Sequence, residues 1–315
     1  MPIARRLLET PLTYDVVIGD FGRDATIEYL RMMAASEREM IESLLERERC
    51  EFFDEYRRIM FCVIGDVAFF KGPAISRSTI DPGYLTADIL VGSEWTPMSP
   101  DFAGRVAVAV AQEALAALDR GHQYLRVVLP CNGLHALAKE VTRLLHAGAE
   151  LQELFVAHHF VTCEMDRLAS AAIKVHTVPE AVMRHLAARQ PGQRTNLLIL
   201  GTQGTNAIYK QLADSSMLSV VPLNGDDYEL ISEAIVASIG GDAAQVARLR
   251  EQLQTRLIEP SAERFRDLVT VEACTDFKLG LGLSSLKLFA EAMVEDCYRT
   301  IASMGSRGQS EGSTR

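Results

Sequence analysis

Two cysteines, Cys131 and Cys274, each come directly after an apolar segment and before a small polar residue. The first segment reads Tyr124-Leu-Arg-Val-Val-Leu-Pro-Cys131-Asn132, and the second ends in Leu268-Val-Thr-Val-Glu-Ala-Cys274-Thr275. Apolar runs of this kind are typical of buried parallel strands, and α/β proteins place their chemistry in the loops that follow such strands. Because the pattern occurs twice, we predict two halves that each present one thiol to a shared cleft.

A second pair of segments supports this duplication. Residues 16–22 (Val-Val-Ile-Gly-Asp-Phe-Gly) and 197–204 (Leu-Leu-Ile-Leu-Gly-Thr-Gln-Gly) both combine an apolar run with a Gly-x-x-Gly turn and precede a helical pattern. Glycines permit a tight turn and a close approach of a ligand to the backbone. Neither turn contains the Gly-x-Gly-x-x-Gly fingerprint of nicotinamide and flavin sites, so we expect no cofactor.

Length and charge narrow the class of protein. The chain has 315 residues, a hydrophobic content of 48% and a net charge of −10. The length suits two domains, and an acidic chain without a basic stripe is not expected to bind nucleic acid. Without a signal-peptide core or an apolar run of about 20 residues, we predict a cytoplasmic protein without a membrane partner. Six cysteines in so long a chain indicate reduced thiols rather than a disulfide framework.

Strand and helix patterns alternate along the chain, which predicts an α/β fold with parallel sheets and helices on both sides. Strands are expected at about 14–18, 59–64, 124–129, 196–200, 218–221 and 267–272, and one more ends near residue 178. Helices are expected at about 24–58, 102–119, 132–146, 179–189, 205–213, 226–239, 243–257 and 284–302. Residues 71–100 contain several prolines and glycines and are predicted to form a long loop that lines a binding site.

Three stretches resemble the cofactor-independent aspartate/glutamate racemase superfamily. Residues 17–26 (Val-Ile-Gly-Asp-Phe-Gly-Arg-Asp-Ala-Thr) are similar to the family's opening Ile-Gly-Gly-x-Gly-Pro-x-Ala-Thr. Residues 131–135 (Cys-Asn-Gly-Leu-His) are similar to Cys-Asn-Thr-Ala-His of the aspartate branch, and residues 273–276 (Ala-Cys-Thr-Asp) to Gly-Cys-Thr-Glu. The Gly-Thr pair at 201–202 also matches a turn in the family's second domain. These matches occur in the family's order and span nearly the whole chain.

The resemblance implies two Rossmann-like α/β lobes related by a pseudo-twofold axis, with the active site in the cleft between them. It places a first lobe with Cys131 at residues 1–155 and a second lobe with Cys274 at 156–284. Residues 285–315 are expected to form a helix that returns to the first lobe, followed by a disordered tail. The family often forms dimers, so a homodimer is expected.

The resemblance also implies an amino-acid racemase that works without pyridoxal phosphate, with Cys131 and Cys274 on opposite faces of the substrate Cα. One thiolate would remove the Cα proton while the other thiol donates one. The pKa of an ordinary cysteine is about 8.5, so the thiolate needs a stabilising environment, and a helix N-terminus after each cysteine would provide it. The remaining cysteines are interpreted as inert apolar residues: Cys50, Cys62, Cys163 and Cys297.

Further site residues follow from the same motifs. The candidate substrate-binding residues are Asp20, Arg77, Asn132, Gly133, Gly201, Thr202, Thr275 and Asp276. Arg77 lies where aspartate racemases carry an arginine that clamps the distal carboxylate; the alternative is a solvated loop arginine. His135 either supports Cys131 or only caps a helix, and Asp276 either tunes Cys274 or caps a helix. No zinc pattern is present, so no metal is expected.

The chain also departs from the family pattern. Gly133 replaces a threonine, Ala273 replaces a glycine, and no lysine occurs between Lys210 and Lys278, where aspartate racemases carry one for the distal carboxylate. A racemase for a non-acidic amino acid, another reaction on a small carboxylate (decarboxylation, isomerisation or hydantoin racemisation) and a non-catalytic binding protein therefore remain alternatives. Decarboxylases of the superfamily keep only the second cysteine, so the presence of both favours a racemase.

Overall fold

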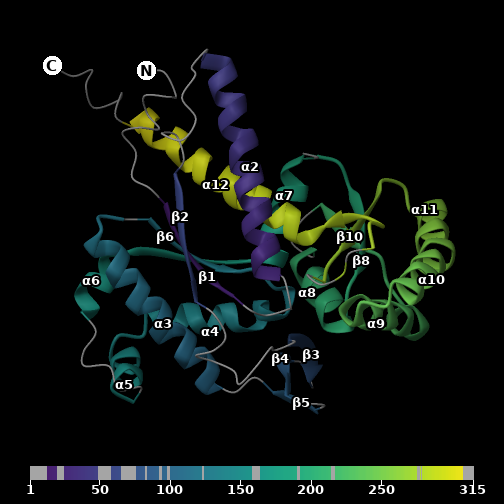
Figure 1. Ribbon diagram of the computed structural model, residues 1–315, viewed down its shortest axis with the longest axis horizontal. Coiled ribbons are helices and arrows are strands. Elements are labelled where there is room, and N and C mark those ends of the chain that lie inside the picture. Colours follow the sequence, from purple (N-terminus) through teal and green to yellow (C-terminus); the bar gives the residue numbers. More distant parts are fainter. Residues whose placement is uncertain are drawn as a thin grey trace.

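In the described part of the chain, the computed structural model has two four-stranded sheets and one three-stranded sheet. The structure describes residues 13–19, 25–48, 58–64, 76–81, 84–91, 94–97, 100–122, 124–157, 164–189, 192–213, 217–274, 277 and 279–307. Figure 1 shows the strands of the two larger sheets in separate parts of the molecule, with helices packed around each.

The first sheet is parallel throughout and has the order β2-β1-β6-β7. Its strands are β1 (Thr13–Ile18), β2 (Ile59–Ile64), β6 (Tyr124–Leu129) and β7 (Ala172–Thr177). β1 is buried along its whole length, and β6 is buried from its second residue onward. Burial on both faces of a parallel sheet explains why these segments read as continuous apolar runs.

The second sheet is also parallel and has the order β11-β10-β8-β9. Its strands are β8 (Thr195–Leu200), β9 (Leu218–Val220), β10 (Leu268–Glu272) and β11 (Leu283–Ser284). In both sheets the first strand, β1 or β8, lies between the second strand and the cysteine-bearing strand, β6 or β10. The last strand, β7 or β11, then completes the sheet. The predicted α/β fold of two Rossmann-like lobes is therefore confirmed.

Helices cover both faces of each sheet and surround a core that joins the lobes (Figure 1). They are α2 (Ala25–Glu48), α3 (Pro100–Asp119), the 3-10 turn η3 (Asn132–Leu134), α4 (His135–Leu145), α5 (Ala149–Ala157), α6 (Met165–Ser170), α7 (Val178–Arg189), α8 (Gln203–Ala213), α9 (Gly225–Gly240), α10 (Ala243–Leu253), the π turn η4 (Gln254–Ile258), α11 (Glu259–Arg264) and α12 (Ser285–Arg307). The joint core contains Val17 and Val128 of the first sheet, Ile199 and Val271 of the second, and Phe289 of α12. Burial of this shared apolar surface holds the two lobes together.

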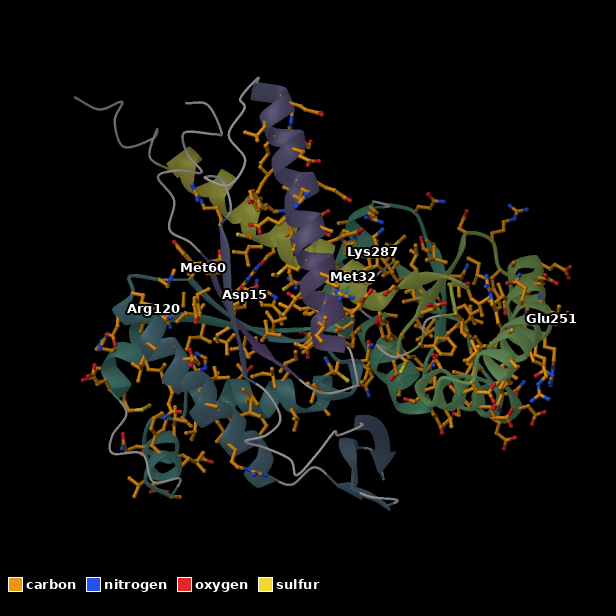
Figure 2. All side chains as sticks on the ribbon, in the orientation of Figure 1. Asp15, Met32, Met60, Arg120, Glu251 and Lys287 are labelled. Atoms are coloured by element: carbon orange, nitrogen blue, oxygen red, sulfur yellow. The ribbon has the colours of Figure 1, made fainter. Side chains whose placement is uncertain are left out.

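The last helix, α12, starts at the second sheet and packs against α2 in the first lobe. Below it, Arg126 on β6 donates two hydrogen bonds to Asp15 on β1, at 2.7 and 2.8 Å. The same guanidinium donates to the carbonyl oxygen of Met293 on α12 at 2.6 Å. The Tyr298 hydroxyl of α12 donates to Oε1 of Glu37 on α2 at 3.2 Å. Figure 2 shows Asp15 among the side chains between the first sheet and α12.

Residues 71–100 do not form the predicted long loop. Within them, β3 (Ser76–Asp81), β4 (Tyr84–Val91) and β5 (Glu94–Pro97) make an antiparallel sheet of order β3-β4-β5. The Pro-Gly pair at 82–83 separates β3 from β4 in the sequence, because prolines and glycines mark the turns between short strands as readily as they mark loops. The prediction of a loop was wrong for these three segments.

The division of the chain between the lobes also differs from the predicted one. β7 pairs with β6 and so belongs to the first sheet, although it lies beyond the predicted limit at residue 155. Its mixed sequence, Ala-Ile-Lys-Val-His-Thr, lacks the continuous apolar run of the other strands. The tail predicted to be disordered is helical up to Arg307, and residues 308–315 lie outside the described part. Among the described residues, no helix is both long enough and apolar enough to cross a membrane.

Candidate active site

Cys131 lies at the carboxyl end of β6, between the ends of β1 and β7. Its side chain is buried, at 8% exposure, and its backbone is extended, with φ −140° and ψ 133°. The residue begins η3, and its carbonyl oxygen accepts a hydrogen bond from the Leu134 amide at 3.2 Å. The Cys131 side chain itself makes no capping hydrogen bond to this turn. Backbone N–H groups at the start of a helical segment favour negative charge, as the predicted thiolate requires.

Cys274 lies at the carboxyl end of β10, one residue after Ala273. The Ala273 amide donates to the carbonyl oxygen of Leu200 at 2.9 Å, which extends the pairing of β10 with β8 up to the cysteine. Cys274 is half-buried against the core of the second lobe. Its strand occupies the same place in the second sheet that β6 occupies in the first. The two thiols therefore end equivalent strands of the two lobes.

The segment after Cys274 differs from the one after Cys131. The predicted helix directly after Cys274 is not found among the described residues 277 and 279–284, and the next helix, α12, begins at Ser285. Instead, the Leu281 amide donates to Oε1 of Glu272 at 2.6 Å and ties this segment to the end of β10. Burial raises the pKa of Glu272, and hydrogen bonds from the backbone of residues 280–282 oppose that shift.

Asn132, next to Cys131, is enclosed by residues from the second half of the chain. Its Oδ1 accepts a hydrogen bond from the Tyr209 hydroxyl of α8 at 3.1 Å, and its Nδ2 lies 3.4 Å from Oγ of Ser285 at the start of α12. α8 follows β8 and α12 follows β11, and these two strands flank the Cys274 strand. The helices beside Cys274 thus reach the residue beside Cys131. Gly133 is buried within η3.

Gly201 and Thr202 form the turn between β8 and α8. A Cβ on Gly201 would lie 3.3 Å from Cβ of Ala273, so this turn packs closely against the Cys274 segment. The Thr202 hydroxyl accepts from the Thr205 amide at 3.2 Å and caps α8. The side-chain amide nitrogen of Asn206 lies 3.1 to 3.3 Å from three carbonyl oxygens, at the end of β8 and in the turn. These contacts fix the shape of the turn.

His135 joins the Cys131 segment to the neighbouring strand. Its Nδ1 lies 3.0 Å from Oγ1 of Thr177 at the carboxyl end of β7. Burial lowers the pKa of His135, and the nearby Glu180 opposes that shift. A neutral imidazole here holds the start of α4 against the end of β7.

Arg77 lies on β3, and the backbone of this strand contacts both η3 and α8. The arginine is therefore placed on the element that lies beside the Cys131 segment, while its side chain is not described. Three other candidates, Asp20, Thr275 and Asp276, lie outside the described residues.

Four residues that the sequence did not single out have clear positions at these strand ends. They are Tyr209, Ser285, Asn206 and Glu272. Glu272 and Asn206 lie within five residues of predicted site residues, so their proximity to Cys274 and Gly201 was a usable signal. Tyr209 and Ser285 approach Asn132 across 77 and 153 sequence positions, and only the packing of the lobes brings them there.

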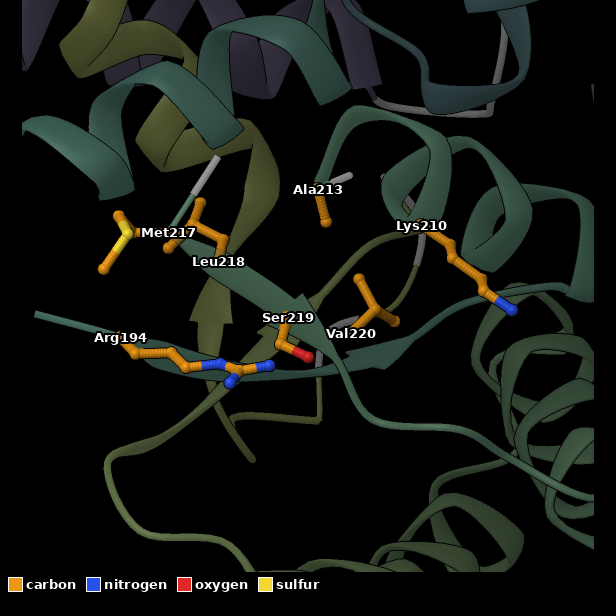
Figure 3. A pocket seen from close by; sticks show the side chains of 7 residues that line it. All are labelled: Arg194, Lys210, Ala213, Met217, Leu218, Ser219 and Val220. Atoms are coloured by element: carbon orange, nitrogen blue, oxygen red, sulfur yellow. The ribbon is translucent and has the colours of Figure 1, made fainter. Parts of the chain in front are cut away.

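Metal-ligand clusters and one cavity were compared with the positions of the two cysteines. No group of three or more His, Cys, Asp and Glu residues in the described part of the chain could hold a metal ion. A cavity of about 400 Å³ lies on the second lobe between α8 and β9, with Arg194 and Lys210 on either side of Ser219 (Figure 3). Arg194 and Met217 precede β8 and β9, so this cavity lies at the opposite end of the strands from Cys274.

Comparisons with known proteins address the fold. No family model and no curated protein sequence matches the chain. The chain is similar in structure to an aspartate racemase homologue from Pyrococcus horikoshii OT3, with a TM-score of 0.54, 15% identity and coverage of 91% of this chain and 99% of that one. The chain has the fold of that protein.

Two further solved structures match with lower scores. For Picrophilus torridus aspartate racemase the TM-score is 0.44 at 12% identity, over 92% of this chain and 95% of that one. For glutamate racemase from Campylobacter jejuni subsp. jejuni it is 0.34 at 14% identity, over 92% and 86%. Scores of this size do not establish a shared fold. The expected racemase-like fold is confirmed by the Pyrococcus protein, and activity is a separate question.

Proposed function

We propose that this protein is an amino-acid racemase that works without pyridoxal phosphate and moves a proton at the substrate Cα with two thiols. One observation carries the proposal. Cys131 and Cys274 end equivalent strands of two matching sheets, and the helices after both strands that flank Cys274 contact Asn132, the neighbour of Cys131. This arrangement supports a small site with one thiol contributed by each lobe.

The proposed reaction assigns a role to each group. The thiolate of one cysteine removes the Cα proton from one face, and the thiol of the other donates its proton to the opposite face. The substrate leaves with inverted configuration, and the two sulfurs have exchanged protonation states, so the reverse reaction uses the same pair. Asn132, the N–H groups of η3 and Thr275 would hold the α-carboxylate and stabilise the charge that develops on it.

The nominal substrates are aspartate and glutamate, with Arg77 as the residue for the distal carboxylate. The position of β3 against η3 and α8 supports this role. One observation favours a second candidate, a racemase for a non-acidic amino acid. Gly133 is buried in η3, where the resembling family carries a threonine, and no lysine follows Lys210 before residue 278.

Exchange of the Cα hydrogen in deuterated water tests the reaction. Purified protein is incubated with single enantiomers of aspartate, glutamate and several neutral amino acids, and products are analysed by NMR and chiral chromatography. We expect Cα deuteration with inversion for at least one of them. A product of altered mass would instead identify a decarboxylase or isomerase, and the absence of exchange with every substrate would contradict the proposal.

The two thiols are tested by Cys131→Ser and Cys274→Ser. We expect each variant to lose racemisation by a factor of about 10³ or more, because general acid–base catalysis contributes roughly 10²- to 10⁴-fold. Cys62→Ser is the matched control, since Cys62 is also a half-buried thiol but lies on β2, outside the proposed site. Near-normal turnover in either of the first two variants would exclude the two-thiol mechanism.

The assembly and the cellular location are also proposals. We propose a homodimer in the cytoplasm that acts on a small molecule and has no nucleic-acid or membrane partner. The resemblance to a family that often dimerises and the net charge of −10 support these statements. Sedimentation equilibrium tests the dimer, for which we expect a mass near twice the 34.7 kDa of the chain.

A further inference from the structure

Tyr209 is a residue of the second lobe that contacts the predicted substrate-binding residue of the first. It lies on α8, its side chain is fully buried, and its hydroxyl donates to Oδ1 of Asn132 at 3.1 Å. Asn132 is itself only 3% exposed. The bond therefore forms in an environment where water does not readily replace either partner.

This hydrogen bond anchors the Asn132 amide to α8. The amide oxygen can only accept, and it lies on the side of α8, where the Tyr209 hydroxyl donates to it. The nitrogen then faces the start of α12, where Oγ of Ser285 lies 3.4 Å away. Ser285 is 1% exposed, so the amide is held between two helices of the second half of the chain.

The nitrogen carries two hydrogens, and Ser285 can accept only one of them. The second N–H group is available for a ligand close to Cys131, the preceding residue. A rotated amide would present its oxygen there instead, and an oxygen acceptor repels a carboxylate. The orientation seen in the structure, with the oxygen bonded to Tyr209, is thus the one that suits an anionic substrate.

We propose that Tyr209 is a positioning residue that acts through Asn132 and aligns its amide N–H with the substrate carboxylate when the two lobes are packed together. This inference rests on the proposed function, because it assigns Asn132 to the carboxylate. Tyr209 itself does not touch the substrate. Its hydroxyl links the packing of α8 to the geometry beside Cys131.

Tyr209→Phe tests this role, since it removes the hydroxyl and keeps the ring. We expect kcat/KM to fall about 10- to 100-fold, mainly through a higher KM, while the thermal unfolding midpoint changes little. Tyr29→Phe is the matched control. Tyr29 is also fully buried, but its hydroxyl has no hydrogen-bond partner among the described residues, so kcat/KM should stay within about twofold of the unaltered protein.

A double-mutant cycle separates positioning from general stability. If Tyr209 acts through Asn132, then Asn132→Ala combined with Tyr209→Phe should be no less active than Asn132→Ala alone. Multiplicative losses in kcat/KM would mean that Tyr209 acts by another route and would overturn the proposal. An unchanged KM and kcat in Tyr209→Phe would overturn it as well.

Alkylation of Cys131 by iodoacetamide gives a readout that does not depend on racemase activity. Loss of the bond to Asn132 should loosen the contact between α8 and η3 and raise the alkylation rate of Cys131 about tenfold, as followed by peptide mass spectrometry. Cys297, a buried residue of α12, serves as the internal control and should stay unreactive. Faster alkylation in a protein without racemase activity would retain the positioning role and refute only the proposed function, whereas an unchanged rate would refute the positioning role.

Discussion

The two lobes have the same strand order, but they differ in the face that each sheet turns toward the joint core. In the first lobe this face carries Asp15 and Arg126, a fully buried ion pair. In the second lobe it carries Leu197, Ile199 and Val271. The first-lobe face adds a hydrogen bond from Arg126 to α12 to the packing of Val17 and Val128, and the second-lobe residues contribute apolar packing. The helix follows β11 of the second sheet and packs against α2 of the first lobe.

The two cysteine segments differ in a related way. Cys131 is followed by helical backbone, and its position depends on the start of η3 and α4. After Cys274, the described residues 277 and 279–282 are non-helical, and Leu281 among them is tied back to β10 through Glu272. The same strand end is therefore stabilised by a helix in one lobe and by a single buried carboxylate in the other. Equivalent places in a duplicated fold need not be built in the same way.

We expect the largest loss of stability when the buried ion pair of the first lobe loses one partner. Arg126→Met leaves the Asp15 carboxylate buried without its partner, which should lower the free energy of unfolding by about 3–5 kcal/mol. Arg143→Met is the control, because Arg143 pairs with Glu140 and Glu150 at the surface. That exposed network should contribute far less to stability, because solvent and salt screen ion pairs at the surface. Urea denaturation measures both, and similar losses would contradict the special role of the first-lobe pair.

The next effect concerns the non-helical segment after Cys274. A Cβ on Gly282 would lie 2.5 Å from the carbonyl oxygen of Thr270 on β10, and this backbone atom cannot easily move aside. We expect Gly282→Ala to reduce the free energy of unfolding by about 3 kcal/mol, the upper part of the range for overpacking. Gly225→Ala, at an exposed glycine with no atom within 4 Å of the added Cβ, should be nearly neutral. Equal stability of the two variants would show that this segment is not packed against β10.

The loss of folding stability at low pH should also depend on the first lobe, through a buried histidine. Burial, together with the charges of Arg126 and Lys174, lowers the pKa of His176 on β7 to about 3. In the unfolded chain a histidine titrates near pH 6.5, so between these values the unfolded state binds more protons and stability falls as the pH falls. The contribution is about 2 kcal/mol between pH 7.5 and pH 5.

His176→Phe removes this titration. Urea denaturation at the two pH values should show an acid-induced loss of stability that is about 2 kcal/mol smaller in the variant than in the unaltered protein. The same loss in both proteins would mean that His176 is protonated in the folded state or is not buried as described. The residues that the second sheet turns toward the joint core, Leu197, Ile199 and Val271, are apolar and do not titrate.

The sequence predicted the elements that local patterns encode. Continuous apolar runs identified β1, β6, β8 and β10, and the small residues after two of them identified the cysteine positions. The antiparallel strands within residues 76–97 were missed, because prolines and glycines indicate turns and loops alike. The prediction of a helix directly after Cys274 was wrong for the described residues of that segment, which include the Gly-rich stretch Leu-Gly-Leu-Gly at 279–282. Glycine is unfavourable within a helix and permits close backbone packing.

The candidate site was predictable only in part, because some of its contacts join residues that are far apart in the sequence. Cys131, Asn132 and Cys274 lie at strand ends, which the pattern of apolar runs locates. Tyr209 has no such signal, because it reads as an ordinary core residue of an amphipathic helix. Its bond to Asn132 depends on how two lobes pack together, and that arrangement arises from the joint core rather than from any local motif.

The smallest expected effect concerns helix caps and completes the comparison. In the second lobe, Asn224 caps α9 with a reciprocal pair of hydrogen bonds to Asp227, at 2.9 and 3.0 Å, whereas the Cys131 side chain makes no capping hydrogen bond to the turn that it begins. Asn224→Ala should lower the free energy of unfolding by about 1 kcal/mol and leave kcat/KM unchanged. Asp242→Ala, which removes the simpler cap of α10, should cost somewhat less. Both losses belong to stability alone, since these helices lie away from the proposed site. A fall in kcat/KM with Asn224→Ala would mean that α9 contributes to the site, and the contrast between a helix that serves stability alone and the turn at Cys131 would then lose its functional meaning.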